Sequence, residues 1–233
     1  MYNDNCCIQT NKEGYEMVML DNKHVFWEAL VIALFVLGIG VFAGMFIEGS
    51  RVDKISNMYQ DSELNLLEIN LQSDIISMNF SDCDSLVESN INFGDKIYQY
   101  AKILEKYQSS AVLTDSLIKE HKKYDLLRTR FWINSIKIKE ECKNPFHTVV
   151  YFYDYNTGDI DKNSKQAVFA QYLKELKDRT GNEIMLIPIA RNMGLTSLDL
   201  LIKKYNVEGT FVLVDEKLVV NSTDQLKLID NAI

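Results

Sequence analysis

The chain has 233 residues, enough for one or two domains, and its 33 acidic residues outnumber its 25 Lys and Arg residues, giving a formal net charge of −8. A surface that binds nucleic acid needs a basic face, so this balance argues against nucleic acid as a partner. Lysines do gather at residues 119–123, but acidic residues interrupt such groups. We therefore expect a solvated helix face there.

The apolar residues are concentrated near the N-terminus. Residues 29–47 carry no charge, and Val25, Phe26 and Trp27 extend the apolar run upstream. At a rise of ~1.5 Å per residue, this stretch can cross the ~30 Å hydrocarbon core of a bilayer. A cleaved signal peptide would have a shorter apolar core, and nothing else in the chain is apolar enough to surround such a helix. We predict a transmembrane helix at residues 24–47, embedded in the lipid bilayer, after a short polar tail at residues 1–23.

Gly40 and Gly44 form a Gly-x-x-x-Gly spacing inside this predicted span. Such a spacing permits close packing of two helices in lipid. It also occurs by chance in many spans, so a homodimer through this face and a coincidental spacing both stay open.

Between the span and the C-terminal region, residues 48–144 contain almost no Gly or Pro, which predicts long helices. The first helix should continue directly from the membrane. Its apolar residues recur at spacings of three and four and so predict one stripe of a helix: Leu64, Leu67, Leu71, Ile75 and Met78. A break follows at residues 79–84.

Two further helices are predicted from their own apolar stripes, with a turn near Ser109. The second helix carries Phe93, Ile97, Tyr100, Ala101, Leu104 and Tyr107. The third begins near Asp115, carries Leu117, Tyr124, Leu127, Phe131 and Ile138, and ends near Cys142. We expect an all-α stalk in which an antiparallel hairpin packs on the membrane-proximal helix, with or without coiled-coil geometry.

The C-terminal region, residues 145–233, alternates strand and helix patterns. An apolar strand at residues 148–153 is followed by a polar loop, a helix at 165–179 and a second apolar run at 183–189. A helix ending at residues 204–207, a hairpin and a last short helix complete the region. This succession resembles the thioredoxin-like superfamily, which implies an α/β domain with a four-stranded mixed sheet and helices.

The resemblance extends to the order of the parts. The span followed by residues 47–53, and residues 138–142 just before the first strand, are similar to the layout of archaeal single-pass membrane proteins with a C-terminal thioredoxin-like domain.

The residues that perform thioredoxin chemistry are missing from the predicted positions. With Gln166 and the apolar helix face after it as the anchor, the two family cysteines fall on Ile160 and Asn163. Phe211 stands in the place of the family's cis-proline, and we expect a trans peptide bond before it because a cis bond there would cost ~3 kcal/mol. Thiol–disulfide exchange requires a thiolate, so the resemblance implies a redox-inactive domain that is not an enzyme.

Cys83 and Cys142 are expected at the same end of the helical hairpin. Arms of ~24 and ~26 residues, or ~36 and ~39 Å at the standard rise, should bring both thiols together. We predict a disulfide that staples the stalk in an oxidising compartment; the alternative is two free buried thiols. Cys6 and Cys7 lie on the other side of the predicted membrane and are expected to be free thiols.

The charges around the span do not orient it, because Lys12 and Lys23 on one side match Arg51 and Lys54 on the other. The resemblance to membrane-anchored thioredoxin-like proteins and the cysteine argument both favour a cytoplasmic N-terminus. We therefore expect a single-pass membrane protein whose C-terminal domain is extracytoplasmic.

No metal or cofactor is expected. The loop pattern Asp159-x-Asp161-x-Asn163 resembles the start of an EF-hand loop, but Ser164 and Ala170 stand where that motif needs Gly and Glu. The three histidines are scattered along the chain and suggest neither a metal site nor a catalytic triad.

Two functions from different classes are consistent with these patterns. The first is a membrane-anchored, redox-inactive thioredoxin-like module that binds a partner protein or serves as a scaffold. The alternative is a membrane-tethered thiol–disulfide oxidoreductase that works through Cys83 and Cys142. A catalytic pair should lie at a helix N-terminus with a lowered thiol pKa, and this property distinguishes the two.

Overall fold

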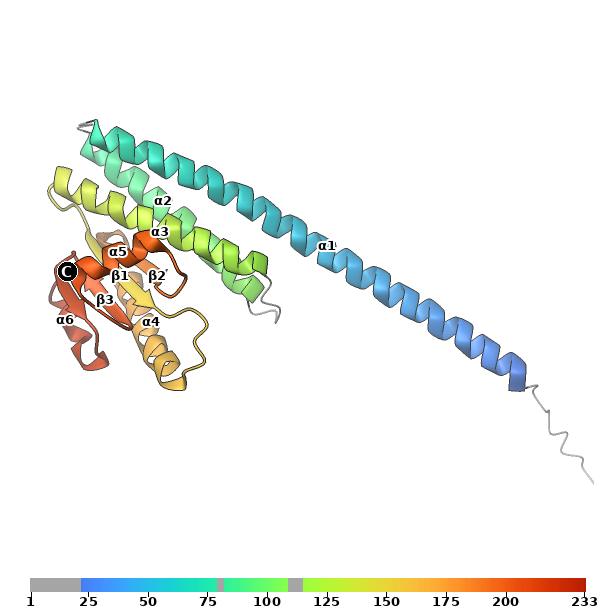
Figure 1. Ribbon diagram of the computed structural model, residues 1–233. Helices are drawn as coiled ribbons and strands as arrows, with labels where there is room; N and C mark the ends of the chain where they lie inside the picture. Colours follow the sequence, from blue (N-terminus) through green and yellow to red (C-terminus); the bar gives the residue numbers. More distant parts are fainter. Residues whose placement is uncertain (1–21, 79–81, 109–114) are drawn as a thin grey trace, which may run out of the picture. The chain divides into compact units, whose positions relative to one another are not determined.

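The computed structural model describes residues 22–78, 82–108 and 115–233 (Figure 1). By its internal contacts the chain divides into two compact units, the first ending at Lys54 and the second running from Ile55 to Ile233. Helix α1, Asn22–Ser77, contributes to both units. Residues 1–21 of the tail predicted at residues 1–23, with Cys6 and Cys7, lie outside the described residues, and so does the predicted turn at Ser109. Asn22 and Lys23 belong to α1.

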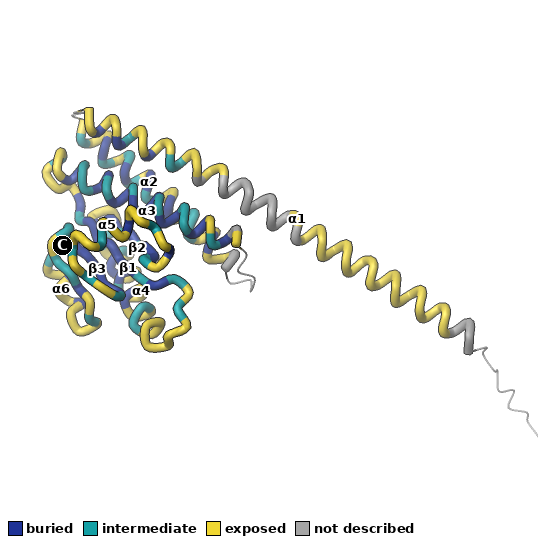
Figure 2. The backbone as a smooth tube through the Cα atoms, in the orientation of Figure 1, coloured by how far each residue is buried: buried dark blue, intermediate teal, exposed yellow. Residues whose placement is uncertain are grey.

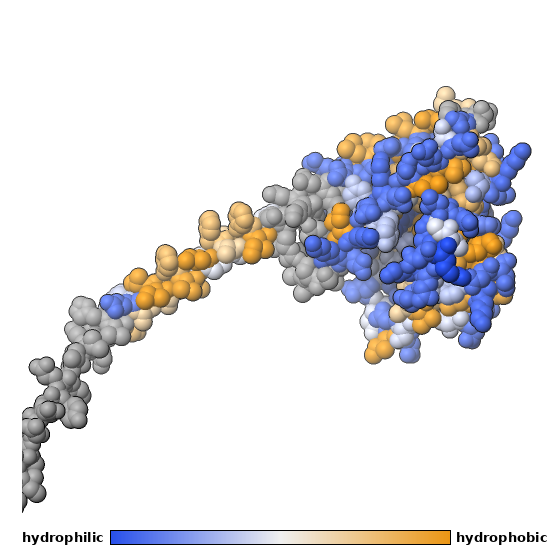
Figure 3. Space-filling model, turned by 180° about the vertical axis from the view of Figure 1, so that it is seen from behind, coloured by the Kyte–Doolittle hydropathy of each residue, from blue (hydrophilic) through white to orange (hydrophobic). Residues whose placement is uncertain are grey.

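The first unit contains the one segment of the described chain that is long and apolar enough to cross a membrane, Phe26–Ile47. Its residues are exposed throughout (Figure 2), and its surface is largely hydrophobic (Figure 3). Burial among the described residues therefore does not explain the apolar composition of this segment. A Cβ built at Gly40 or Gly44 meets no protein atom within 4 Å, so the close packing proposed for this pair stays a prediction.

The second unit begins with three helices: the end of α1, then α2, Cys83–Gln108, and α3, Asp115–Glu141. Helices α2 and α3 lie side by side, and their predicted apolar stripes are turned inward. The buried members are Phe93, Ile97, Leu104, Leu117, Tyr124, Leu127, Phe131 and Ile138.

The predicted stripe of α1 does not face this hairpin. Leu64, Leu67, Leu71, Ile75 and Met78 are all exposed, whereas Ile69, Ser73 and Ile76 are buried. Helix α1 thus carries apolar residues on two sides, and polar contacts hold the side with Ile69 and Ile76 against the hairpin. Asn134 Nδ2 donates to the Ile69 carbonyl at 3.1 Å, and Lys137 Nζ donates to Ser73 Oγ at 2.8 Å.

The rest of the second unit is a four-stranded sheet in the order β2-β1-β3-β4. The strands are β1 (His147–Tyr153), β2 (Ile184–Ala190), β3 (Phe211–Val214) and β4 (Leu218–Val220). Strands β1 and β2 are parallel, and β3 runs antiparallel to both β1 and β4, so the sheet is mixed.

The helices around the sheet are α4 (Ile160–Thr180), α5 (Thr196–Tyr205) and α6 (Lys227–Asp230), with short 3-10 turns at Gly181–Glu183 and Thr223–Gln225. Alternate residues of β1 enter two different cores, because successive strand side chains point to opposite faces. Val150 and Phe152 pack with residues of α3 and α5, whereas Val149 and Tyr151 pack with residues of α4 and α6.

The hairpin and the sheet share one of these cores. Leu127, Phe131 and Trp132 of α3 belong to the same buried cluster as Val150 and Phe152 of β1. The predicted boundary between residues 144 and 145 therefore marks the change from helices to sheet, but the packing continues across it.

Candidate functional site

Ile160 and Asn163, the positions predicted from the resemblance to match the family's cysteines, lie at the start of α4. Ile160 is the first residue of that helix and its side chain is 79% exposed, one residue after the N-cap Asp159. The Asp159 carboxylate accepts hydrogen bonds from the backbone N–H groups of Asp161 and Lys162. Asn163 Nδ2 donates to the Thr157 carbonyl at 2.9 Å, which closes the loop onto the helix. An apolar side chain and an amide in these places can neither attack nor resolve a disulfide.

Phe211, the third of these positions, is the first residue of β3 and is fully buried. Its ring stacks on that of Phe152, with 4.5 Å between the centroids. No peptide bond in the described ranges is cis. Phe211, which the resemblance puts in the place of the family's cis-proline, is thus a residue of the hydrophobic core.

Gln166 joins the loop, α4 and the start of β3. Its Oε1 accepts from the Asp154 backbone N–H at 2.7 Å and from Thr210 Oγ1 at 3.2 Å, and its Nε2 donates to the Asp154 carbonyl. Ligand sites of α/β folds lie at this carboxyl end of the parallel strands, so this edge of the sheet is the first place to look for chemistry.

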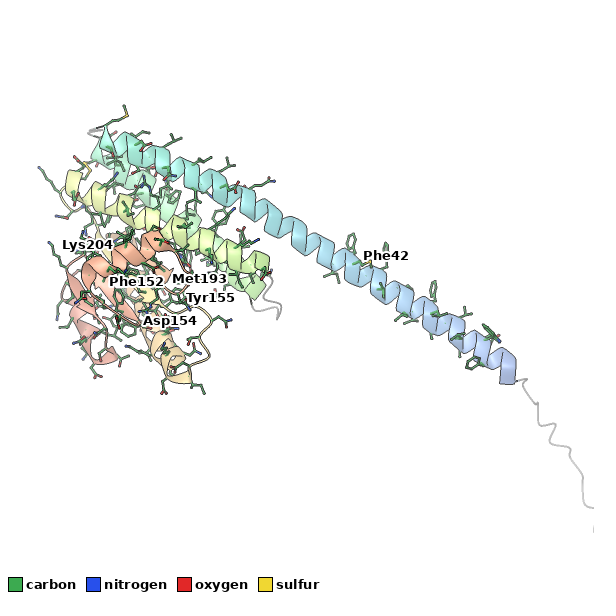
Figure 4. The ribbon with its side chains drawn as sticks, in the orientation of Figure 1. Phe42, Phe152, Asp154, Tyr155, Met193 and Lys204 are labelled. Atoms are coloured by element: carbon green, nitrogen blue, oxygen red, sulfur yellow. A yellow bond between two sulfur atoms is a disulfide. The ribbon has the colours of Figure 1, made fainter. Side chains whose placement is uncertain are left out.

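Asp154 forms a charged group with two bases at that edge. One carboxylate oxygen lies 3.1 Å from Arg191 Nε and the other 3.2 Å from Lys162 Nζ. Arg191 also donates to the Gly209 carbonyl at 2.9 Å. Figure 4 places Asp154 and Tyr155 just beyond the core residue Phe152, with Met193 nearby, and Asn192 ties Tyr155 to the β2–α5 loop through two hydrogen bonds.

Helix α3 covers the same edge with a buried polar cluster. Asp125 Oδ1 lies 3.6 Å from Arg128 Nη1 and accepts from the Ala190 backbone N–H, at the end of β2, at 3.2 Å. His121 Nδ1 lies 3.9 Å from Asp125 Oδ2, and the His121 ring contacts that of Tyr155 with 4.0 Å between centroids. Glu120 and His121 are buried, so the solvated face predicted around residues 119–123 is corrected: the sheet edge covers part of it.

The electrostatics of this cluster give no nucleophile. Burial raises the pKa of Tyr124 to about 12, and burial likewise raises the pKa of Tyr153, so both phenols are protonated at neutral pH. Burial alone would lower the pKa of Arg128, but Tyr124, Tyr153 and Asp125 outweigh it and raise that pKa. Nor does any group of three or more His, Cys, Asp or Glu side chains in the described ranges have an arrangement that could hold a metal ion. The cluster attaches α3 to the sheet and offers no catalytic apparatus.

Cys83 and Cys142 lie at the opposite edge of the sheet, near the amino ends of the parallel strands β1 and β2. Cys83 and Cys142 form a disulfide with 5.5 Å between their Cα atoms. It borders a groove of about 490 Å³ whose lining includes Pro145 and Asn182, which precede β1 and β2. Since β1 has seven residues, this edge lies about 20 Å along the strand from the loop that begins at Asp154.

The surroundings of the disulfide are acidic. Cys83 is the first residue of α2. A helix N-terminus and basic neighbours each favour a thiolate, whereas acidic neighbours oppose one. Asp84 and Glu88 line the groove, and none of the described residues that line it is basic, while Asp82 accepts hydrogen bonds from the Ser85 backbone N–H and Ser85 Oγ. The disulfide therefore closes the helical hairpin, and the acidic residues around it do not favour a reactive thiolate.

A second polar cluster joins the end of α3 to the β3–β4 turn. Lys139 is buried and bonds Asp215, Glu216 and Thr148, and Trp132 Nε1 donates to Glu216 Oε1 at 2.8 Å. Burial works to raise the pKa of Asp215, but hydrogen bonds from Lys139, His147 and the Thr148 backbone N–H outweigh it and lower the pKa below 3.8.

Comparisons with protein families, curated proteins and solved structures find no match to this chain. The site is therefore judged on its own geometry. Sequence patterns placed Asp154 in a loop rich in polar oxygen atoms, but they did not identify Asp125, Arg128 or Asp215 as members of polar clusters. The only available signal was the i, i+4 and i+3 spacing of His121, Asp125 and Arg128, which puts them on one face of a helix.

The Asp215 cluster predicts a dependence of stability on pH. A carboxyl whose pKa is lowered by folding stabilises the protein above its unfolded pKa, and this contribution is lost as the pH falls through the folded value. Asp215→Asn should lower the free energy of unfolding at pH 7, and its difference from wild type should shrink as the pH falls below about 4. Urea titrations across that range measure this, with the exposed Asp178→Asn as control. A difference that is constant with pH would contradict the assignment.

The disulfide closes a segment with a sequence separation of 59 residues. In the loop-entropy picture a bridge of this length stabilises the folded state by about 4 kcal/mol. We expect the free energy of unfolding of a Cys83→Ser/Cys142→Ser variant to be lower than that of wild type by about 4 kcal/mol, so the variant should unfold at a lower urea concentration. Dithiothreitol should lower the unfolding midpoint of wild type and leave that of the variant unchanged. Equal midpoints for wild type with and without reductant would contradict this account.

Proposed function

We propose that the chain is a membrane-anchored, redox-inactive thioredoxin-like protein that acts as a protein-interaction or scaffold module. The observation that carries this proposal is the separation of the only disulfide in the described residues from the edge where thiol chemistry would be expected. That edge presents Ile160 and Asn163, whereas Cys83 and Cys142 lie at the other end of β1.

The element order supports the thioredoxin-like part of the proposal. Strand, helix, strand, helix, hairpin and short helix follow one another as the resemblance requires, and the four strands form a mixed sheet. Gln166, the anchor of the comparison, bonds both the loop after β1 and the residue before Phe211. These contacts support the equivalence of Ile160, Asn163 and Phe211 with the family's active-site positions.

The apolar helix Phe26–Ile47 supports a single membrane anchor, and the disulfide supports an extracytoplasmic second unit, because disulfides persist in oxidising compartments. The alternative, an oxidoreductase that uses Cys83 and Cys142, has one favourable feature: Cys83 begins a helix. The acidic lining of its groove opposes a thiolate there, so we prefer the non-catalytic function.

The proposal predicts that the full-length chain in detergent does not accelerate the reduction of insulin by dithiothreitol. The reason is that Ile160 and Asn163 stand in the proposed positions of the family's cysteines, and that Asp84 and Glu88 line the groove beside the disulfide. Turbidity of the released insulin chains measures the rate, and a Cys83→Ser/Cys142→Ser variant is the control. A rate above background in wild type that the variant loses would support the oxidoreductase instead.

A further inference from the structure

The strongest unexplained feature outside the two polar clusters is an exposed apolar face on α1, which we call the α1 stripe. It consists of Leu64, Leu67, Leu71, Ile75 and Met78, each between 46% and 79% exposed. Their spacings of three and four residues align them on one side of the helix. In the space-filling view hydrophobic side chains run along the edge of the second unit where α1 lies in Figure 1 (Figure 3).

The opposite side of α1 packs on the hairpin formed by α2 and α3. Ile69 and Ile76 are buried in the shared core, and Ser73 between them accepts a hydrogen bond from Lys137. Gln72 Nε2 donates to Ser89 Oγ of α2 at 2.8 Å. Helix α1 is therefore fixed in rotation on the hairpin, and the α1 stripe is held outward by these contacts. An apolar surface of this length, once held outward, is typical of an interaction site.

The charged residues that α1 itself places beside its stripe have one sign. Residues 55–78 contain four acidic residues, Asp61, Glu63, Glu68 and Asp74, and no Lys, Arg or His. Glu63 is paired with Lys123 at 3.0 Å, whereas Glu68 and Asp74 form no ion pair with any residue in the described ranges. At 100° per residue, Asp61 and Glu68 fall on one border of the stripe and Glu63 and Asp74 on the other. The stripe is thus an apolar line between acidic borders.

These charges disfavour a second copy of the chain as the occupant. In a parallel two-stranded coil with Leu64 and Leu71 at a and Leu67 at d, Glu63 of one copy would face Glu68 of the other. The same register would place Asp74 at the next d position, inside the seam. Two copies anchored in one membrane with the same orientation would have to pair in this parallel sense.

We infer that the α1 stripe binds an amphipathic helix of a partner protein whose apolar face is bordered by Lys or Arg. Leucines of such a helix would cover the stripe, and its basic borders would pair with Glu68 and Asp74. This inference rests on the proposed interaction function and names the surface and the chemistry of the partner.

A pair of designed peptides tests the inference on the full-length chain in phosphatidylcholine nanodiscs. Both have about three heptads with Leu at a and d; one carries Lys at e and g, and the other Glu. We expect the Lys peptide to bind wild type and the Glu peptide not to bind. Leu67→Ser/Leu71→Ser should weaken binding at least about tenfold, because two leucines lose their apolar contact. The equally exposed Leu200→Ser on α5 is the matched control and should leave it unchanged.

Two further measurements test the role of charge in binding and identify the molecule bound at the α1 stripe. Glu68→Gln/Asp74→Asn should weaken binding of the Lys peptide several-fold and flatten its dependence on salt. A photoreactive p-benzoylphenylalanine in place of Leu71 should cross-link to the Lys peptide, and one in place of Leu200 should not. Cross-links from position 71 mainly to a second copy or to lipid would overturn the inference, as would equal binding of both peptides or insensitivity to Leu67→Ser/Leu71→Ser.

Failure here differs from failure of the proposed function. If thiol-dependent turnover of insulin appears, the proposed function falls whatever the peptides do. If there is no turnover and membranes yield a partner complex that Leu67→Ser/Leu71→Ser leaves intact, the proposed function stands and the α1 stripe is not the docking site.

Discussion

The second unit depends on the burial of α3, which has no exposed side chain from Glu120 to Lys139. This helix carries many charged groups, and pairing matters for the buried ones because an unpaired buried charge is strongly destabilising. Arg128 lies against Asp125 and Tyr124 at one edge of the sheet, and Lys139 reaches Asp215 and Glu216 at the other. These pairs fix α3 along the length of the sheet. On another side of α3, Asn134 and Lys137 form hydrogen bonds to α1.

This use of the polar residues bears on function. The carboxyl edge of the parallel strands, where α/β proteins commonly bind ligands, is filled by the side chains that attach α3. The first turn of α4 exposes Ile160 and Asn163 to solvent there. The disulfide holds the ends of α2 and α3 together at the other edge. Both ends of the parallel strands therefore serve the architecture, and the exposed stripe of α1 is the surface on which the proposed interaction can be tested.

Much of this arrangement could be predicted from local patterns. The apolar run at residues 24–47, the strand–helix alternation after residue 145 and the inward stripes of α2 and α3 depend on residues close in sequence. The orientation of α1 could not be predicted, because Leu64 and Leu71 form a better stripe than Ile69 and Ile76, and polar partners 60 or more residues away decide between them. The buried cluster around Asp125 was missed for the same reason: a charged helix face is read as solvated until the sheet that covers it is known.

The central claim is that the hairpin and the sheet are one cooperative body joined through α3. Native-state hydrogen exchange of the full-length chain in detergent, for wild type and Phe152→Ala, tests it most directly. Phe152 is fully buried against Trp132 of α3 and Phe211 of β3, and its truncation should cost about 3–5 kcal/mol. The account predicts that the slowest amides of α3 and of β1 lose the same free energy of opening. Undiminished protection of α2 and α3 beside a weakened sheet would contradict it and would make the helices a separate stalk.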